Sequence, residues 1–229
     1  MKILFTKKSI EKEVRQKINS EIECEFVDVL KIKHRKESPF SLSNKSLIFT
    51  SVNGVQSFFE NGFMPEEDFT NPYRYNKIYA VGNKTKKELR KNGFGTFKVA
   101  KHASELLDFI IKHASKEQFI HFCGNMALDL LNEKLPLQNI VYRKVILYDT
   151  ELLHPKIDEN HDAVCFFSPS GVRSFAKLNS LEGKTLFSIG ETTEKELKNW
   201  TKNKIYTSKE SSLNDLLNLI NTHYKTLIS

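Results

Sequence analysis

The sequence is short of the residues that cross-link or anchor a chain. It has only three cysteines in 229 residues, and Cys24, Cys123 and Cys165 lie far apart, within or beside apolar runs. An odd number of widely spaced cysteines argues against a disulfide framework, so we expect three buried, reduced thiols. No segment approaches the roughly 18 consecutive apolar residues of a membrane span, and the apolar run in "MKILFTKK" is too short for a signal peptide. These absences predict a cytoplasmic protein without a membrane partner.

Motifs that hold metals or nucleotides are also missing. The seven histidines form no HExxH motif, no pair at i and i+4, and no set with the cysteines at ligand spacing, so no metal is expected. There is no GxxxxGK[ST] or GxGxxG fingerprint, and "NGFGTF" precedes a strand rather than a helix. Nucleotide binding is therefore weakly supported.

The charge balance is basic. The formal net charge is +7, from 35 Lys and Arg against 28 Asp and Glu, which favours an anionic partner. No basic block interleaved with aromatic residues occurs, so solvated lysines are a better interpretation than a nucleic-acid surface.

The most informative feature present is a repeat. "FTSVNGVQSF" at residues 49 to 58 and "FFSPSGVRSF" at residues 166 to 175 share an aromatic run, Ser, two residues, Gly-Val and Ser-Phe. "IYAVGNKTKKELRKNGF" at 78 to 94 likewise matches "LFSIGETTEKELKNW" at 186 to 200, with Gly82 opposite Gly190 and Thr85 opposite Thr193. Periods of this size are typical of a duplicated domain rather than a solenoid. We therefore expect two domains built on one plan.

Short apolar runs alternate with helical patterns, which favours an α/β fold with mostly parallel strands. Helices are expected at 85 to 93 and 193 to 200, each opening with an N-capping Thr, and at "ASELLDFII" and "SSLNDLLNLI". Ten strands with their helices fit two similar five-stranded sheets of the flavodoxin or Rossmann kind. The expected strands are residues 2–6, 23–33, 46–51, 77–82, 96–100, 118–124, 140–150, 162–168, 185–190 and 204–208.

Two of these strands are too long for an ordinary sheet. Residues 23–33 and 140–150 each run about twice the usual strand length of five or six residues. We expect them to leave their sheets and to form a two-stranded β connector. The first domain would then be discontinuous, comprising residues 1–32 and 158–229, with the second domain inserted as 44–146 and the connector at 33–43 and 147–157.

Six small polar segments fall at carboxyl ends of the expected strands: "FTKKS", "FTSVNG", "VGNKT", "FCGN", "FSPSG" and "IGETT". Ligands of open α/β sheets bind at this edge, and helix N-termini there offer free N–H groups to carboxylates or phosphates. Any one segment could simply cap a helix, but six together favour a binding cleft between the domains. The candidate binding residues are Lys7, Thr50, Ser51, Asn83, Thr85, Gly124, Asn125, Ser168, Ser170, Gly171, Thr192 and Thr193.

With these motifs in order, the sequence resembles the uroporphyrinogen-III synthase family over nearly the whole chain. The resemblance is carried by "IFTSVNGV", "YAVGNKT", "FCGN", "LYDT", "FFSPSGV" and "SIGETT". It implies two α/β domains joined by a β-ladder, an interdomain cleft for a linear tetrapyrrole, and no cofactor. The implied reaction is dehydration and cyclisation of hydroxymethylbilane, with inversion of the fourth ring through a spirocyclic intermediate.

The resemblance also implies roles for single residues. Tyr148 in "LYDT" matches the tyrosine proposed in the family to assist loss of the hydroxyl group; its alternative role is an aromatic cover over the connector strand. Leu128 stands near the place where the family commonly has an Arg, which puts a carboxylate contact there in doubt. Orientation of the fourth ring would be the enzyme's main task.

Other interpretations remain open at this point. A catalytically silent or regulatory tetrapyrrole- or anion-binding relative would share most of these motifs. A periplasmic-type binding module would share the hinged architecture, but the sequence shows no signal peptide. We also expect a monomer, since no long apolar surface helix demands a dimer, and a transient hand-over of substrate from the upstream hydroxymethylbilane synthase.

Overall fold

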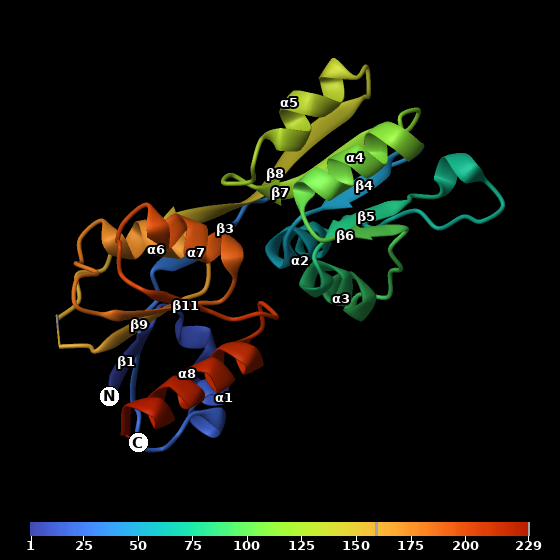
Figure 1. Cartoon of the computed structure of the whole chain (residues 1–229). Helices are drawn as coiled ribbons and strands as arrows, with labels where there is room; N and C mark the ends of the chain where they lie inside the picture. The colour runs from blue at the N-terminus through green and yellow to red at the C-terminus, as the bar shows by residue number, and fades with distance from the viewer. Residues whose placement is uncertain (159, 229) are drawn as a thin grey trace. The chain divides into compact units, whose positions relative to one another are not determined.

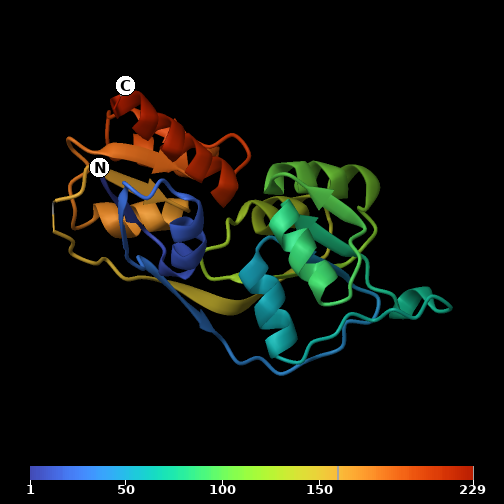
Figure 2. The same cartoon turned by 90° about the horizontal axis from the view of Figure 1, so that it is seen from below.

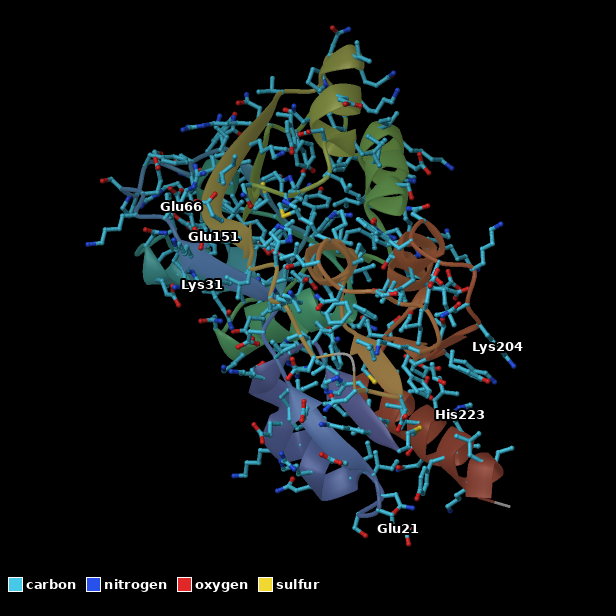
Figure 3. All side chains as sticks on the ribbon, turned by 90° about the vertical axis from the view of Figure 1, so that its left-hand side faces the viewer. Glu21, Lys31, Glu66, Glu151, Lys204 and His223 are labelled. Carbon is cyan, nitrogen blue, oxygen red and sulfur yellow. The ribbon has the colours of Figure 1, made fainter. Side chains whose placement is uncertain are left out.

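Two compact units make up the chain: Met1–Lys31 with Glu151–Ser229, and Ile32–Thr150. The computed structural model describes residues 1–158 and 160–228. Each unit is a sheet with helices on both faces (Figure 1). The boundary between the units falls inside strands β3 (Leu30–His34) and β8 (Tyr142–Leu152). Lys31 and Glu151, labelled in Figure 3, lie on these two neighbouring strands. The narrower domain limits expected from the sequence stay a prediction.

The first unit is a five-stranded parallel sheet in the order β11-β10-β9-β1-β2. Its strands are β1 (Lys2–Phe5), β2 (Glu23–Phe26), β9 (Ala163–Phe166), β10 (Thr185–Ser188) and β11 (Ile205–Thr207). A 3-10 turn η1 (Lys8–Ile10) precedes helix α1 (Glu11–Lys17), which shares one face with α8 (Leu213–Ile228). Helices α6 (Pro169–Ala176) and α7 (Glu191–Lys198) cover the other face. Figure 2 shows the start of the chain and α8 in this same unit.

The second unit is a six-stranded sheet in the order β3-β8-β7-β4-β5-β6. Besides β3 and β8 it contains β4 (Ser46–Phe49), β5 (Ile78–Val81), β6 (Lys98–Ala100) and β7 (Phe119–Gly124). Helices α2 (Val52–Glu60) and α3 (Asn83–Lys91) pack on one face, and α4 (Ala103–His113) and α5 (Leu130–Leu137) on the other. The loop that carries a second 3-10 turn, η2 (Pro72–Arg74), extends away from the sheet (Figure 2). Among the described residues, none of the helices has the length and apolarity to cross a membrane.

The expected parallel α/β plan is confirmed, but the strand count was wrong. Residues 23–33 form two strands, β2 and β3, because the chain between them turns Val29 into the core of the first unit, where only 1% of it is exposed. The sheets therefore have five and six strands instead of five each. Strand β8 is as long as expected, at eleven residues. It pairs with β7 from Tyr142 to Tyr148 and then runs on to Leu152. Strands β3 and β8 are neighbours, and both cross the boundary between the units, so the expected two-stranded connector is confirmed.

The first repeated motif builds the same helix start in both units. Ser51 and Ser168 are the N-cap residues of α2 and α6, and each Oγ accepts a hydrogen bond from the N–H of Gly54 or Gly171, at 3.0 and 3.1 Å. A Cβ on Gly54 would lie 2.8 Å from the carbonyl oxygen of Phe122 on β7. Serine thus caps both helices, and glycine lets α2 approach the neighbouring strand.

The Ser-Phe part of the motif holds the incoming chain. Ser57 on α2 is buried, and its Oγ lies 2.7 Å from Nδ1 of His34, where the chain enters the second unit. In the first unit, buried Ser174 on α6 accepts from the N–H of His154 and donates to the carbonyl oxygen of Val29. Each serine ties its helix to the segment next to the unit boundary.

The second repeated motif begins its helices earlier than expected. Gly82 and Gly190 occupy the N-cap positions of α3 and α7, so the helices start two residues before Thr85 and Thr193. Gly82 has φ of +82°, a conformation that favours glycine. The two threonines lie within the first turn and are 3% and 1% exposed. The prediction that these threonines are N-cap residues was wrong, because glycines occupy the N-cap positions and the threonine side chains are buried.

Candidate functional site

The candidate site lies along the carboxyl edges of the two sheets. In the first unit, β1 is followed by β2 on one side of it, whereas β9 is followed by β10 on the other side. In the second unit, β4 is likewise followed by β5 on one side and β7 by β8 on the other. Open parallel sheets bind ligands outside the carboxyl ends of such strand pairs, because the loops there diverge and leave room. Each unit therefore offers one favoured position for a ligand, between β1 and β9 in the first unit and between β4 and β7 in the second. We describe the two positions separately.

In the first unit this position is flanked by four of the predicted residues. Lys7 follows β1 and is exposed, while Ser168, Ser170 and Gly171 follow β9 at the start of α6. The Oγ atoms of Ser168 and Ser170 lie 3.3 Å apart, so two hydroxyl groups meet at the first turn of a helix. Thr192 is exposed at the start of α7, one strand farther out.

In the second unit four predicted residues flank the corresponding position. Thr50 and Ser51 follow β4, and Gly124 and Asn125 lie at the end of β7. Asn125 is exposed, but its amide oxygen accepts from the N–H of Thr150 at 2.9 Å. Asn83 is exposed at the start of α3, one strand farther out. Buried Thr85 and Thr193 present little side chain to a ligand in either unit.

Tyr148 lies on β8 beside this second position. Its hydroxyl is 2.9 Å from Oγ of Ser51, and its ring packs against Gly124, where a Cβ would collide with the ring. Only 8% of Tyr148 is exposed. Burial raises the pKa of its phenol, while the hydrogen bond to Ser51 lowers it. The residue thus carries a protonated hydroxyl that is held in place at the edge of the sheet.

The carboxylate next to Tyr148 is already occupied. Asp149 accepts two hydrogen bonds from the guanidinium of Arg35, each 2.7 Å long. These bonds hold the pKa of the Asp149 carboxyl below its ordinary value. A paired carboxylate of this kind cannot serve readily as a proton donor, which leaves Tyr148 as the acidic group of the "LYDT" segment.

The sequence did not reveal a buried histidine below Thr50. His121 is 1% exposed in the middle of β7, with Nε2 2.9 Å from Oγ1 of Thr50 and Nδ1 2.7 Å from the hydroxyl of Tyr142. Burial lowers its pKa to about 3, with a smaller contribution from Lys144. The available signal was a histidine inside the otherwise apolar strand "FIHFCG".

The loop after β7 lacks the basic residue that the resemblance led us to look for. Leu128 is 78% exposed there. The nearby cation is Lys144 on β8, whose Nζ donates to Oδ1 of Asp129 at 2.7 Å and to the carbonyl oxygen of Ala127 at 3.2 Å. Lys144 therefore anchors the loop. Within residues 1–158 and 160–228, no three His, Cys, Asp or Glu side chains gather as a metal site would need.

Comparison with known proteins identifies one family. The model of a family described as uroporphyrinogen-III synthase HemD matches residues 19–218. Among curated protein sequences, none matches the chain.

Solved structures share its fold. The uroporphyrinogen-III synthetase of Helicobacter pylori has a TM-score of 0.63 at 20% identity, over 97% of this chain and 99% of that one. A mutant uroporphyrinogen III synthase of Thermus thermophilus has a TM-score of 0.67 at 13% identity, over 99% of this chain and 98% of that one. These similarities extend over both units.

Proposed function

Because this chain belongs to the uroporphyrinogen-III synthase family, we propose that the carboxyl edges of its two sheets bind the linear tetrapyrrole, with Tyr148 as the proton donor. The enzyme is a cyclising hydro-lyase of heme biosynthesis. It closes hydroxymethylbilane to uroporphyrinogen III, with loss of water and inversion of the fourth ring. The observation that carries the proposal is the contact among Tyr148, Ser51 and Gly124 at the edge of the second sheet.

The chemistry begins with the loss of a hydroxyl group from a hydroxymethyl substituent. That loss leaves a cationic azafulvene and is easier when an acid donates a proton to the departing oxygen. A neutral phenol can do this, and the raised pKa of Tyr148 keeps its proton in place until the substrate arrives. Ser51 fits a supporting role, because its Oγ accepts from Gly54 and can donate its own hydrogen to the Tyr148 oxygen.

Orientation supplies the rest of the catalysis. The cation could react at more than one ring carbon, and the enzyme must bring the substituted carbon of the fourth ring nearest. Holding two reacting groups in contact can lower a barrier by several kcal/mol, about 7 to 11 in favourable cases. The N–H groups at the starts of α2 and α6, the hydroxyls of Thr50, Ser168 and Ser170, and the cation of Lys7 suit the carboxylates of the substrate.

The proposal extends to the state of the protein. We expect a cytoplasmic monomer whose two units close on the substrate at a cleft between them. We also expect it to receive hydroxymethylbilane by transient hand-over from the enzyme that makes it. These expectations come from the sequence and from the instability of the substrate, which closes unaided to the wrong isomer.

The decisive experiment is a product-isomer assay. Hydroxymethylbilane is generated in the presence of the protein, and the oxidised products are separated by chromatography. We expect mostly the type III isomer. If only the type I isomer forms, as in a control without the protein, the chain is a catalytically silent relative. The roles proposed for Tyr148 and for the substrate-binding groups would then be wrong.

A further inference from the structure

We propose that His121 is a positioning residue that, together with Tyr142, fixes the hydroxyl of Thr50 as a hydrogen-bond donor to a carboxylate of the substrate. This inference deepens the proposed function and rests on it. The three side chains form one hydrogen-bonded chain from β8 through β7 to the carboxyl end of β4. Neither His121 nor Tyr142 needs to touch the substrate for this role.

Both ring nitrogens of His121 take part in these hydrogen bonds. Nε2 lies 2.9 Å from Oγ1 of Thr50, and Nδ1 lies 2.7 Å from the hydroxyl of Tyr142. The ring is 1% exposed, because β7 is a central strand with β4 and β8 as its neighbours. A histidine so enclosed cannot turn to water for a partner, so its two hydroxyl neighbours decide which nitrogen carries hydrogen.

The imidazole of His121 is neutral within this series of hydrogen bonds. Burial, aided by the nearby Lys144, lowers the pKa of His121 to about 3. Burial also raises the pKa of Tyr142, so the phenol keeps its hydrogen. A neutral imidazole has one N–H and one bare nitrogen, and a phenol donates a hydrogen bond more readily than it accepts one.

These facts select one direction of hydrogen bonding. Tyr142 donates to Nδ1, which leaves the hydrogen of His121 on Nε2. That N–H then donates to Oγ1 of Thr50, so the Thr50 hydroxyl must use its own hydrogen elsewhere. Thr50 is half-buried and follows β4 at the position where the second sheet is expected to bind its ligand. The hydroxyl is thereby prepared to donate to an anion.

The opposite direction would give a different site. If Thr50 donated to His121, its oxygen could only accept hydrogen bonds from a ligand, and it would repel a carboxylate. The substrate of this family carries carboxylates, which accept hydrogen bonds and donate none. The direction set by Tyr142 is therefore the one that suits those carboxylates.

A spectroscopic test addresses the hydrogen bonds directly. The full-length protein is labelled with ¹⁵N-histidine, and long-range proton–nitrogen spectra at about pH 7 report which ring nitrogen carries hydrogen. His121→Gln identifies the signal of His121 among the seven histidines. We expect the neutral form with hydrogen on Nε2. Hydrogen on Nδ1, or a charged ring, would overturn the inference whatever the enzyme's activity.

A double-mutant cycle tests whether His121 acts through Thr50. We expect Thr50→Val to raise the KM for hydroxymethylbilane about tenfold and to change kcat less than about threefold, since a bond to a charged group is lost. His121→Phe should raise KM by a similar factor, and the double variant should be no worse than Thr50→Val. Separate roles would instead multiply the two losses and overturn the inference.

Conservative variants and a control complete the test. His121→Gln can still donate an N–H toward Thr50, so its KM should lie nearer to that of the wild type. If His121→Phe fails to fold, Tyr142→Phe removes only one hydroxyl from the same chain. Its effect on KM should likewise vanish in the Thr50→Val background, and an effect that persists there would overturn the inference.

His161→Phe is a matched control. It removes a histidine that is 5% exposed and hydrogen-bonded to Glu25. This histidine lies directly before β9, at the amino edge of the first sheet and thus away from the carboxyl edge proposed to bind the substrate. It should lower thermal stability without changing KM. A wild-type protein that makes no type III isomer would defeat the proposed function and this inference together, whereas multiplied losses in an active enzyme would defeat this inference alone.

Discussion

At the scale of single residues, the hydroxyl of Tyr148 has the clearest predicted effect. Tyr148→Phe removes the proton donor and one hydrogen bond to Ser51 but keeps the aromatic ring against Gly124. We expect the rate of cyclisation to fall about 10 to 100-fold, within or below the usual range for a general acid. The preference for the type III isomer should persist, since other groups position the rings.

Rate, isomer ratio and melting temperature measured on one sample separate this role from a structural one. If Tyr148 only covers the strand, Tyr148→Phe should leave the rate within about twofold, and a lower melting temperature should be its main effect. An unchanged rate would remove Tyr148 from the active site.

Gly124 is predicted to be indispensable for the place of that ring. In Gly124→Ala the new Cβ would meet Cε2 and Cζ of Tyr148 and would lie 2.9 Å from its hydroxyl, so the ring must move. Overpacking of this kind costs about 1 to 3 kcal/mol. We expect a lower melting temperature and a loss of activity at least as large as that of Tyr148→Phe. Gly95→Ala is the matched control, because a Cβ there meets nothing within 4 Å. A fully active Gly124→Ala enzyme would contradict the proposed position of the Tyr148 hydroxyl.

At the scale of elements, the repeated helix starts of α2 and α6 allow a matched pair of substitutions. Ser51→Ala and Ser168→Ala each remove an N-cap hydroxyl that accepts from a glycine N–H three residues later. Loss of such a cap costs about 1 kcal/mol, so the two variants should lower the stability of their own units by similar amounts in calorimetry. Only Ser51 also contacts Tyr148, and Ser51→Ala should therefore reduce kcat in addition. Equal kcat values for the two variants would argue against a supporting role for Ser51.

At the scale of the whole molecule, the chain passes between its two units only within β3 and β8. Two units linked in this way can move as bodies when a ligand contacts both, because a few residues in the linking strands can absorb the change. We expect small-angle scattering to show compaction when uroporphyrinogen III is added without oxygen. A radius of gyration that stays constant at saturating product would contradict closure.

Much of the architecture could be predicted because it depends on local pattern. The alternation of apolar runs and helical periods predicted the parallel α/β class, and the repeated "S-x-x-G-V-x-S-F" pattern predicted two similar units, since the same backbone contacts need the same residues. The ordered motifs indicated the family, which the family comparison confirms. The role suggested for Tyr148 by "LYDT" stays a prediction. The break between β2 and β3 was missed, because "ECEFVDVLKIK" has a strand-forming composition throughout and only the core around Val29 interrupts it.

The sequence by itself thus determined the fold class, the duplication and the segments at the edges of the strands, since each depends on residues close together in the chain. Tertiary structure alone decided which of those residues are exposed to a ligand and which side chains contact one another. It buries Thr85 and Thr193 within their helices' first turns, and it brings Ser51 to Tyr148 across 97 positions of sequence. It also joins Thr50, His121 and Tyr142 through three neighbouring strands. Such contacts depend on strand order and register, which no local pattern specifies, because pairing brings together residues that are far apart in the chain.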